Sequence, residues 1–313
     1  MDTDILEPFL EQQRGDRNKL YALLGRLPAR NRPISAETVL TEDRGTFTLE
    51  KLSLDLNGIE PVPAYLLLPK QPRGGRKPPV VVYHHSHGGF YGVGKEELLR
   101  PAPYMRQPGY GEALTERGYA VLAIDSWVFG ERSGRSELSV FKEMLWHGRS
   151  LLGMMLYDAI KAIDYVATRP EVDGNRIGTV GMSMGSTMAW WLGALDTRVR
   201  AVADICCLTD FHALMKEGGL DRHGIYYYIP DLLTHFNAAQ INALIAPRPH
   251  LSAAGLHDPL TPVAGLDRIE QELNKVYRSV GAADAWKLLR YETGHVETAE
   301  MRQEVLDFFD RVL

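Results

Sequence analysis

The segment Gly181-Met182-Ser183-Met184-Gly185 places a hydroxyl side chain between two glycines, a spacing that suits nucleophilic chemistry. An apolar run leads into it, and a helix-like run, residues 187–192, follows at once. A serine between a strand and a helix occupies a very tight turn, where larger residues at the glycine positions would collide with neighbouring backbone. The turn presents the hydroxyl at the amino terminus of a helix, where the helix dipole favours negative charge.

A serine hydroxyl becomes a good nucleophile only with a base in hydrogen-bond reach and a group that orients this base. Of the ten histidines, His295 is the predicted base, because it follows the last predicted strand and precedes the last helix. Asp258 follows the preceding predicted strand in a loop rich in Gly and Pro, and it is the predicted acid. Asp210, which follows an earlier strand, remains an alternative acid. Ser183, Asp258 and His295, in this order, would form a catalytic triad.

An acyl-transfer site must also stabilise the negative charge that develops on the carbonyl oxygen. The backbone amide of Met184, directly after the serine, is one predicted donor. The second donor is expected to be a backbone amide of residues 88–90 in the loop 84–90, where Gly88 and Gly89 let the backbone approach a ligand closely. The sequence does not decide among these amides. The loop also contains three histidines, but no Cys, Asp or Glu stands at ligand spacing beside them. We therefore predict neither a metal nor a cofactor.

Two aromatic residues near these loops, Phe90 and Trp127, are predicted to contact the substrate. Trp127 lies in the segment 125–132, which follows another predicted strand, and the alternative is that its ring packs this segment onto the body. Residues 89–95 match the phosphate-binding pattern Gly-x-x-x-x-Gly-Lys. Glu96 replaces the Ser or Thr that would bind magnesium, so phosphate binding is disfavoured.

The elements that position these residues alternate between strands and helices. Short apolar runs predict strands buried on both faces, at residues 80–83, 119–124, 176–180, 199–208, 249–254 and 286–291. Helices are predicted at residues 151–168, with Asp158 on a polar side, and at about 298–312. This alternation favours the α/β class, with a doubly wound, mostly parallel sheet.

The domain organisation is predicted from where this alternation begins and where it is interrupted. Residues 1–45 are polar with apolar positions at helical spacing, and they predict an N-terminal helical extension. Residues 46–56 and 62–68 predict a β-hairpin. Residues 46–313 would form one domain, with a small cap-like helical insertion over the pocket at about 209–243.

Composition excludes several classes of partner. The net charge of the 313-residue chain is −5 without a long basic run, which argues against nucleic acid. No apolar run approaches about 18 residues, so no membrane partner is expected. The N-terminus lacks the apolar region of a signal peptide, which predicts a cytoplasmic location. Cys206 and Cys207 are adjacent in an apolar run and are predicted to be buried thiols. Homo-oligomerisation stays open.

From about residue 47 onward the chain resembles the α/β-hydrolase superfamily. The resemblance rests on the Gly-x-Ser-x-Gly segment, on Asp258 in a Gly-x-x-Asp-x-x-x-Pro setting, and on Gly294-His295. Within the superfamily the chain is similar to the dienelactone-hydrolase-like and acetyl-xylan-esterase-like branch, in residues 87–90, 125–132 and 245–249. True dienelactone hydrolases carry cysteine where this chain has Ser183.

The resemblance implies a serine hydrolase that cleaves carboxylic esters through an acyl-enzyme, including deacetylation of carbohydrates or other small esters. Two alternatives remain. A peptidase of the prolyl-oligopeptidase type usually carries a large N-terminal propeller, for which 45 residues leave no room. A non-catalytic binding protein of the α/β-hydrolase fold would have lost its triad, and a complete triad argues against it.

Overall fold

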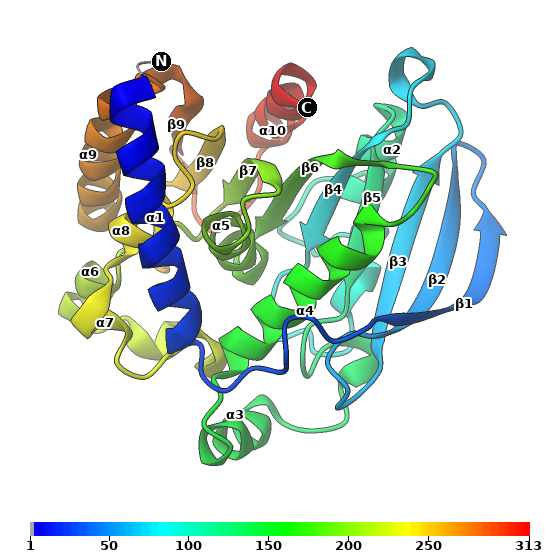
Figure 1. Cartoon of the computed structure of the whole chain (residues 1–313), viewed down its shortest axis with the longest axis horizontal. Coiled ribbons are helices and arrows are strands. Elements are labelled where there is room, and N and C mark those ends of the chain that lie inside the picture. The colour runs from blue at the N-terminus through cyan, green and yellow to red at the C-terminus, as the bar shows by residue number, and fades with distance from the viewer. Residues whose placement is uncertain (1–2) are drawn as a thin grey trace.

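The computed structural model describes residues 3–313, and this part of the chain forms one nine-stranded sheet (Figure 1). Its strand order is β1-β2-β3-β5-β4-β6-β7-β8-β9. The strands are β1 (Ser35–Asp43), β2 (Phe47–Asp55), β3 (Val62–Pro69), β4 (Pro79–His84), β5 (Ala120–Ile124), β6 (Asp173–Met182), β7 (Val199–Ile205), β8 (His250–Gly255) and β9 (Trp286–Tyr291). The pairs β1–β2, β2–β3 and β3–β5 are antiparallel and the other five pairs are parallel. The predicted mostly parallel sheet is confirmed.

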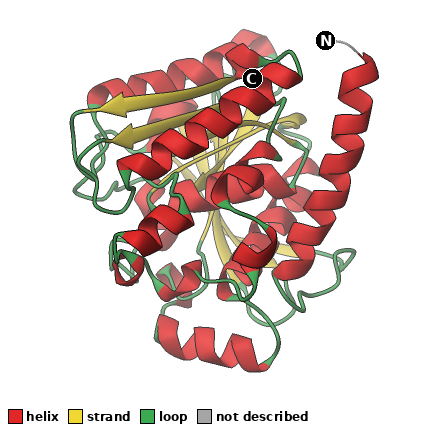
Figure 2. Cartoon of the chain, turned by 90° about the vertical axis from the view of Figure 1, so that its left-hand side faces the viewer, coloured by secondary structure: helices red, strands yellow, loops and turns green. Residues whose placement is uncertain are grey.

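Helices cover both faces of this sheet (Figure 2). Strand β4 shows why: Val80 and Val82 pack in one apolar cluster and Val81 and Tyr83 in another, because side chains alternate along a strand. The first cluster includes side chains of α1 (Thr3–Leu23), α3 (Glu137–Trp146), α4 (Leu151–Ala167), α5 (Met184–Leu195), α6 (Phe211–Lys216), α7 (Leu232–His235), α8 (Ala238–Ala243) and α9 (Val263–Ser279). The second includes α2 (Tyr110–Glu116) and α10 (Ala299–Val312).

The first 45 residues differ from the predicted helical extension. Helix α1 lies there, but Ser35–Asp43 forms β1, the edge strand that pairs with β2. Nearly every residue of β1 is exposed, so the strand forms through backbone pairing and has no buried face. Without a buried face the sequence carries no alternation of polar and apolar residues, which explains why the strand was not predicted. Residues 1–2 of the predicted extension lie outside the described part.

The hairpin predicted at residues 46–68 is confirmed by the antiparallel pairing of β2 with β3. Helices α6, α7 and α8 lie between β7 and β8, within the stretch that the sequence predicts to be an insertion.

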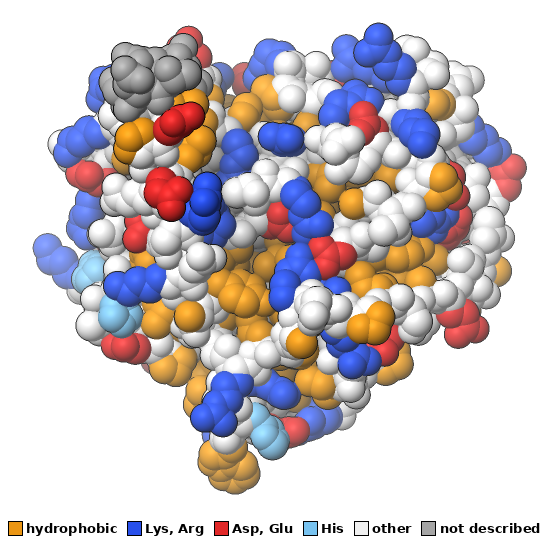
Figure 3. Space-filling model, viewed as in Figure 1, with side chains coloured by type: hydrophobic (Ala, Val, Ile, Leu, Met, Phe, Trp, Pro, Cys, Tyr) orange, Lys and Arg blue, Asp and Glu red, His pale blue; other side chains and the backbone are white. Residues whose placement is uncertain are grey.

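The molecular surface carries basic and acidic side chains interspersed on the face that Figure 3 shows. Over the described residues, no helix has the length and hydropathy needed to cross a membrane.

Candidate active site

Ser183 stands at the turn from β6 into α5 with backbone angles φ 60° and ψ −119°. Residues other than glycine rarely adopt a positive φ, and such strain is common at functional sites. A Cβ on Gly181 would lie 2.4 Å from the backbone of Gly185, and a Cβ on Gly185 would lie 2.1 Å from the carbonyl oxygen of His84. These close approaches give the steric reason for the Gly-x-Ser-x-Gly spacing. The Ser183 amide donates to the Ile205 carbonyl at 2.9 Å, which ties the turn to β7.

The Gly185→Ala substitution is expected to lower the free energy of unfolding by about 3 kcal/mol or more, since the new methyl group would meet backbone that cannot move away. Gly15→Ala is the matched control. Gly15 lies inside α1 with no atom within 4 Å of a built Cβ, so alanine should stabilise the helix by about 1 kcal/mol. Urea unfolding of both variants measures the two effects. Equal effects at the two sites would contradict the steric account.

His295 and Asp258 form a hydrogen-bonded pair beyond the carboxyl ends of β9 and β8. The distance between His295 Nδ1 and Asp258 Oδ2 is 2.7 Å. The Asp258 carboxylate also accepts the Leu260 amide at 2.9 Å, which fixes its orientation. The two loops approach closely, because a Cβ on Gly255 would lie 2.3 Å from the Gly294 carbonyl oxygen. The pair predicted as base and acid is therefore brought together.

Asp210 and His257 serve other contacts. Asp210 is the N-cap of α6: its carboxylate accepts the Ala213 amide at 2.8 Å and pairs with Arg268 at 2.9 Å. His257 is exposed and pairs with Glu292 at 2.9 Å. Among the described residues, Asp258 is the only acidic residue that forms a hydrogen bond with His295.

The amides predicted as oxyanion donors differ in how they are used. The Gly89 amide donates to His87 Nδ1 at 3.1 Å, and the Phe90 amide donates to the His87 carbonyl at 2.9 Å. Among the described residues, the amides of Met184 and Gly88 have no acceptor. Gly88 has φ 48°, a value that favours glycine. Gly88 therefore suits the second donor position better than Gly89.

The histidines at the start of this loop hold it in place. His84 Nε2 lies 3.0 Å from Thr179 Oγ1, and burial lowers the pKa of His84 to about 3. His85 Nδ1 lies 2.9 Å from the Ser86 carbonyl, and its Nε2 accepts the Ser126 amide at 3.1 Å. Burial also lowers the pKa of His85. Both rings stay neutral near pH 7 and link the loop to β6 and to the segment 125–132.

A buried network behind this loop was not found from the sequence. The Ser86 amide donates to Glu97 Oε1 at 2.8 Å, the Ser86 hydroxyl donates to the same carboxylate, and it lies 2.5 Å from the Tyr104 hydroxyl. The Tyr104 ring centroid is 6.0 Å from that of His295, and a Cβ on Gly88 would lie 2.5 Å from the Tyr104 hydroxyl. Burial raises the pKa of Tyr104 to about 12. Glu97 lies in a 3₁₀-helix of five residues, Gly94–Leu98, and Tyr104 lies in a turn, so neither belongs to an element long enough to show a periodicity.

Aromatic rings surround His87 beside the loop. Its ring centroid lies 5.0 Å from Phe129, 5.1 Å from Tyr91 and 5.9 Å from Tyr226. Glu137 Oε2 lies 3.3 Å from His87 Nε2 and accepts the Tyr91 hydroxyl at 3.0 Å. Tyr226 belongs to the segment between β7 and β8, so these contacts join that segment to the loop.

The predicted substrate contacts separate into a buried and an exposed residue. Trp127 is only 5% exposed, and the Arg132 guanidinium lies 4.3 Å from its ring centroid. This packing favours the alternative, in which the ring holds its segment onto the body, while a contact of Trp127 with substrate stays a prediction. Arg132 also pairs at 3.0 Å with Asp158, which is buried rather than on a polar helix side. Phe90 is 45% exposed beside Gly89 and remains a predicted contact.

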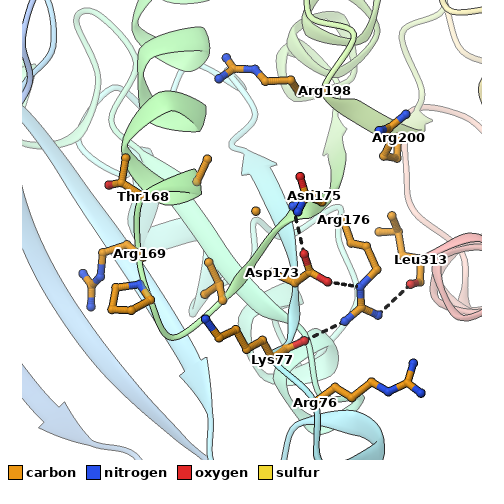
Figure 4. A pocket seen from close by; sticks show the side chains of 14 residues that line it. Arg76, Lys77, Thr168, Arg169, Asp173, Asn175, Arg176, Arg198, Arg200 and Leu313 are labelled. Atoms are coloured by element: carbon orange, nitrogen blue, oxygen red, sulfur yellow. Dashed lines mark hydrogen bonds and ion pairs between the residues drawn. The ribbon is translucent and has the colours of Figure 1, made fainter.

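A large basic hollow lies at the amino end of β6, whereas Ser183 follows the carboxyl end of this strand (Figure 4). It is lined at the start of β6 by residues such as Asp173, and Ser183 follows the end of the same strand. At about 3.3 Å per residue, the two places are roughly 30 Å apart. The cationic lining residues are Arg76, Lys77, Arg169, Arg176, Arg198 and Arg200. This hollow is therefore separate from the candidate active site.

A mostly parallel sheet, a strained serine between a strand and a helix, and a His–Asp pair after the last two strands define an α/β-hydrolase. The profile of the dienelactone hydrolase family matches residues 62–280, and the chain belongs to this family. Over 297 residues it is 50% identical to the Bacillus subtilis (strain 168) protein named "Putative hydrolase YtaP", covering 95% of this chain and 98% of that protein. The chain is a hydrolase.

Solved structures share the fold at low sequence identity. A "putative acetyl xylan esterase" from Bacteroides fragilis NCTC 9343 aligns with a TM-score of 0.72 and 23% identity, over 90% of this chain and 75% of that one. A glucuronoyl esterase from Solibacter usitatus aligns with a TM-score of 0.69 and 17% identity, over 94% and 91%.

Proposed function

We propose that this hydrolase is a serine carboxylesterase in which Ser183 is the nucleophile, His295 the base and Asp258 the orienting acid. The observation that carries the proposal is the 2.7 Å hydrogen bond between His295 Nδ1 and Asp258 Oδ2. It lies at the same edge of the sheet as the strained turn that bears Ser183.

Neighbouring contacts support the approach of the serine to this pair. The Ser183 amide donates to the carbonyl of Ile205, the last residue of β7. Cys206 follows Ile205 directly, and its thiol forms a cluster with the side chains of Asp258 and His295. In that cluster one side-chain donor atom from each residue lies within 4.8 Å of the others. The turn that bears Ser183 and the His295–Asp258 pair therefore both contact the end of β7, at Ile205 and Cys206 respectively.

The proposed mechanism follows from the tautomer that the pair favours. A proton on His295 Nδ1, donated to Asp258, leaves Nε2 free to accept the Ser183 hydroxyl proton. Ser183 Oγ then attacks the ester carbonyl carbon, and the oxyanion is stabilised by the amides of Met184 and Gly88. His295 returns its proton to the leaving alcohol. Water, activated by the same imidazole, hydrolyses the acyl-enzyme.

We propose acetyl esters of carbohydrates or other small alcohols as the substrates. Two features support this choice: the structural similarity to a putative acetyl xylan esterase, and the partly exposed aromatic rings of Phe90, the last residue of the loop 84–90, and of Tyr91, which follows it. Aromatic rings at a partly exposed site suit the apolar faces of sugar rings.

A substrate panel tests the proposal: p-nitrophenyl esters of increasing acyl length, acetylated xylo-oligosaccharides and a prolyl p-nitroanilide. We expect acetate to give the highest kcat/KM, with release of acetate from the sugar and no cleavage of the anilide. Preferred cleavage of the anilide would favour the peptidase alternative. Absence of all hydrolysis, together with no labelling by a fluorophosphonate, would favour a binding protein.

A further inference from the structure

Cys206, Asp258 and His295 together form the cluster of potential metal ligands described above. Cys206 and Asp258 are buried and His295 is partly exposed, and the cluster adds the Cys206 thiol to two residues of the candidate active site. The set contains one sulfur, one carboxylate and one imidazole, and zinc and cadmium bind such mixed sets. Three loops, after β7, β8 and β9, bring the three residues together.

The thiol is held in this cluster by the backbone. Cys206 has φ 52°, a conformation that residues other than glycine rarely adopt. Its amide donates to the Ala253 carbonyl at 2.8 Å, and its thiol approaches the Val296 carbonyl at 3.8 Å. The neighbouring Cys207 points elsewhere, with its sulfur 3.7 Å from Thr209 Oγ1. The chain therefore directs one of two adjacent thiols toward the His–Asp pair.

We propose that Cys206, Asp258 and His295 form an inhibitory binding site for a thiophilic divalent cation, Zn²⁺ or Cd²⁺. The ligand atoms would be Cys206 Sγ, an Asp258 carboxylate oxygen and His295 Nδ1, with water as the fourth ligand. The inhibitory effect rests on the proposed function, because it acts through the proposed base.

The present spacing is close to that of a metal site. Bond lengths of about 2.0–2.3 Å in a tetrahedron place ligand atoms roughly 3.3–3.8 Å apart. The cluster, with its limit of 4.8 Å, would contract by about 1 Å, and the 2.7 Å contact between His295 Nδ1 and Asp258 Oδ2 would open slightly.

Metal binding inverts the proton arrangement on which the proposed catalysis depends. The Cys206 thiol loses its proton to solvent, because the thiolate is the ligand. The metal takes the position of the Nδ1 proton of His295, and a neutral imidazole then keeps its single proton on Nε2. A protonated Nε2 cannot accept the proton of Ser183. Each bound ion thus releases one net proton and removes the base.

Burial raises the pKa of the Cys206 thiol, and the nearby Asp258 charge raises it further. In the absence of metal the thiol is therefore protonated, and it donates to the Val296 carbonyl. A divalent charge reverses this balance, since it stabilises the thiolate directly.

The test compares the full-length wild type with Cys206→Ala, Cys206→Ser and the matched control Cys207→Ala. Calorimetry with CdCl₂ in two buffers of different ionisation enthalpy gives stoichiometry, affinity and proton release without an activity assay. Hydrolysis of p-nitrophenyl acetate at increasing CdCl₂ gives the inhibition constant. Circular dichroism checks that each variant is folded. If one of the two Cys206 variants fails to fold, the other still tests the proposal.

We expect the wild type and Cys207→Ala to bind one Cd²⁺ per chain with release of one proton and loss of activity. Both Cys206 variants should bind and be inhibited at least about tenfold more weakly. Equal binding by wild type and folded Cys206 variants, or no binding at all, would overturn the proposal. Cys206-dependent binding by a chain that hydrolyses no ester would support the metal site and refute the proposed esterase function. Ester hydrolysis without such binding would refute the metal site alone.

Discussion

Replacing Ser183 with alanine is expected to lower kcat on p-nitrophenyl acetate by roughly 10⁴- to 10⁶-fold, because no other group can form the acyl-enzyme. Alanine keeps the Cβ in the strained turn, so the backbone hydrogen bond to Ile205 and the fold should persist. Initial rates and fluorophosphonate labelling measure the loss, and thermal unfolding checks the fold.

Ser186→Ala is the matched control for this substitution. Ser186 lies three residues further along, in the same helix, and its buried hydroxyl contacts the Asp204 carboxylate at 3.2 Å. Its loss should lower stability by about 1 kcal/mol and leave kcat within a few-fold. Full activity of Ser183→Ala, or an equal loss in Ser186→Ala, would show that the nucleophile has been assigned wrongly.

Replacing Asp258 with asparagine is expected to lower kcat by roughly 10³- to 10⁴-fold. An amide cannot stabilise the imidazolium by charge, and its NH₂ group can donate to His295 Nδ1, which places the proton on Nε2. Steady-state kinetics of the ester reaction measure this loss, and KM should change little because Asp258 is not proposed to contact the substrate.

Asp210→Asn tests the alternative acid under the same conditions. Asparagine can still accept the Ala213 amide at the start of α6, and the lost charge pair is with the largely exposed Arg268. We expect nearly unchanged kcat and a small drop in melting temperature. A silent Asp258→Asn combined with an inactive Asp210→Asn would move the acid to the loop after β7.

The buried strands and the candidate nucleophile could be predicted from the sequence because their signals are local. Strands β4 and β6 lie inside the sheet between helices, so their cores read as short apolar runs. The Gly-x-Ser-x-Gly spacing is set by contacts within a few residues of Ser183 and by one approach to His84. The pairing of His295 with Asp258 followed from the order of the strands, since parallel strands end at the same edge.

Features that depend on distant partners were missed or misread. The exposed edge strand β1 has no buried face, so residues 35–43 carry no strand pattern. In the sequence, Trp127 is predicted as a substrate contact and Asp158 as a polar helix position, yet both are buried, and Arg132 contacts both of them. The residues that contact these positions are far apart from them in the sequence, so the local periodicity of polar and apolar residues does not indicate the contacts.

The sequence by itself determined the fold class, the tight turn at Ser183 and the order of the groups proposed to act on an ester, because these follow from backbone sterics and strand order. Only the tertiary structure decided that Gly88 rather than Gly89 keeps a free amide, and that Ser86, Glu97 and Tyr104 support the loop. The sequence predicts no metal site, because no Cys, Asp or Glu stands at ligand spacing beside the histidines of the loop 84–90. The potential metal ligands Cys206, Asp258 and His295 come from three other loops. These loops are far apart in the sequence, and their side chains meet only when the chain folds. Their contacts therefore depend on tertiary packing, which no local sequence pattern reports.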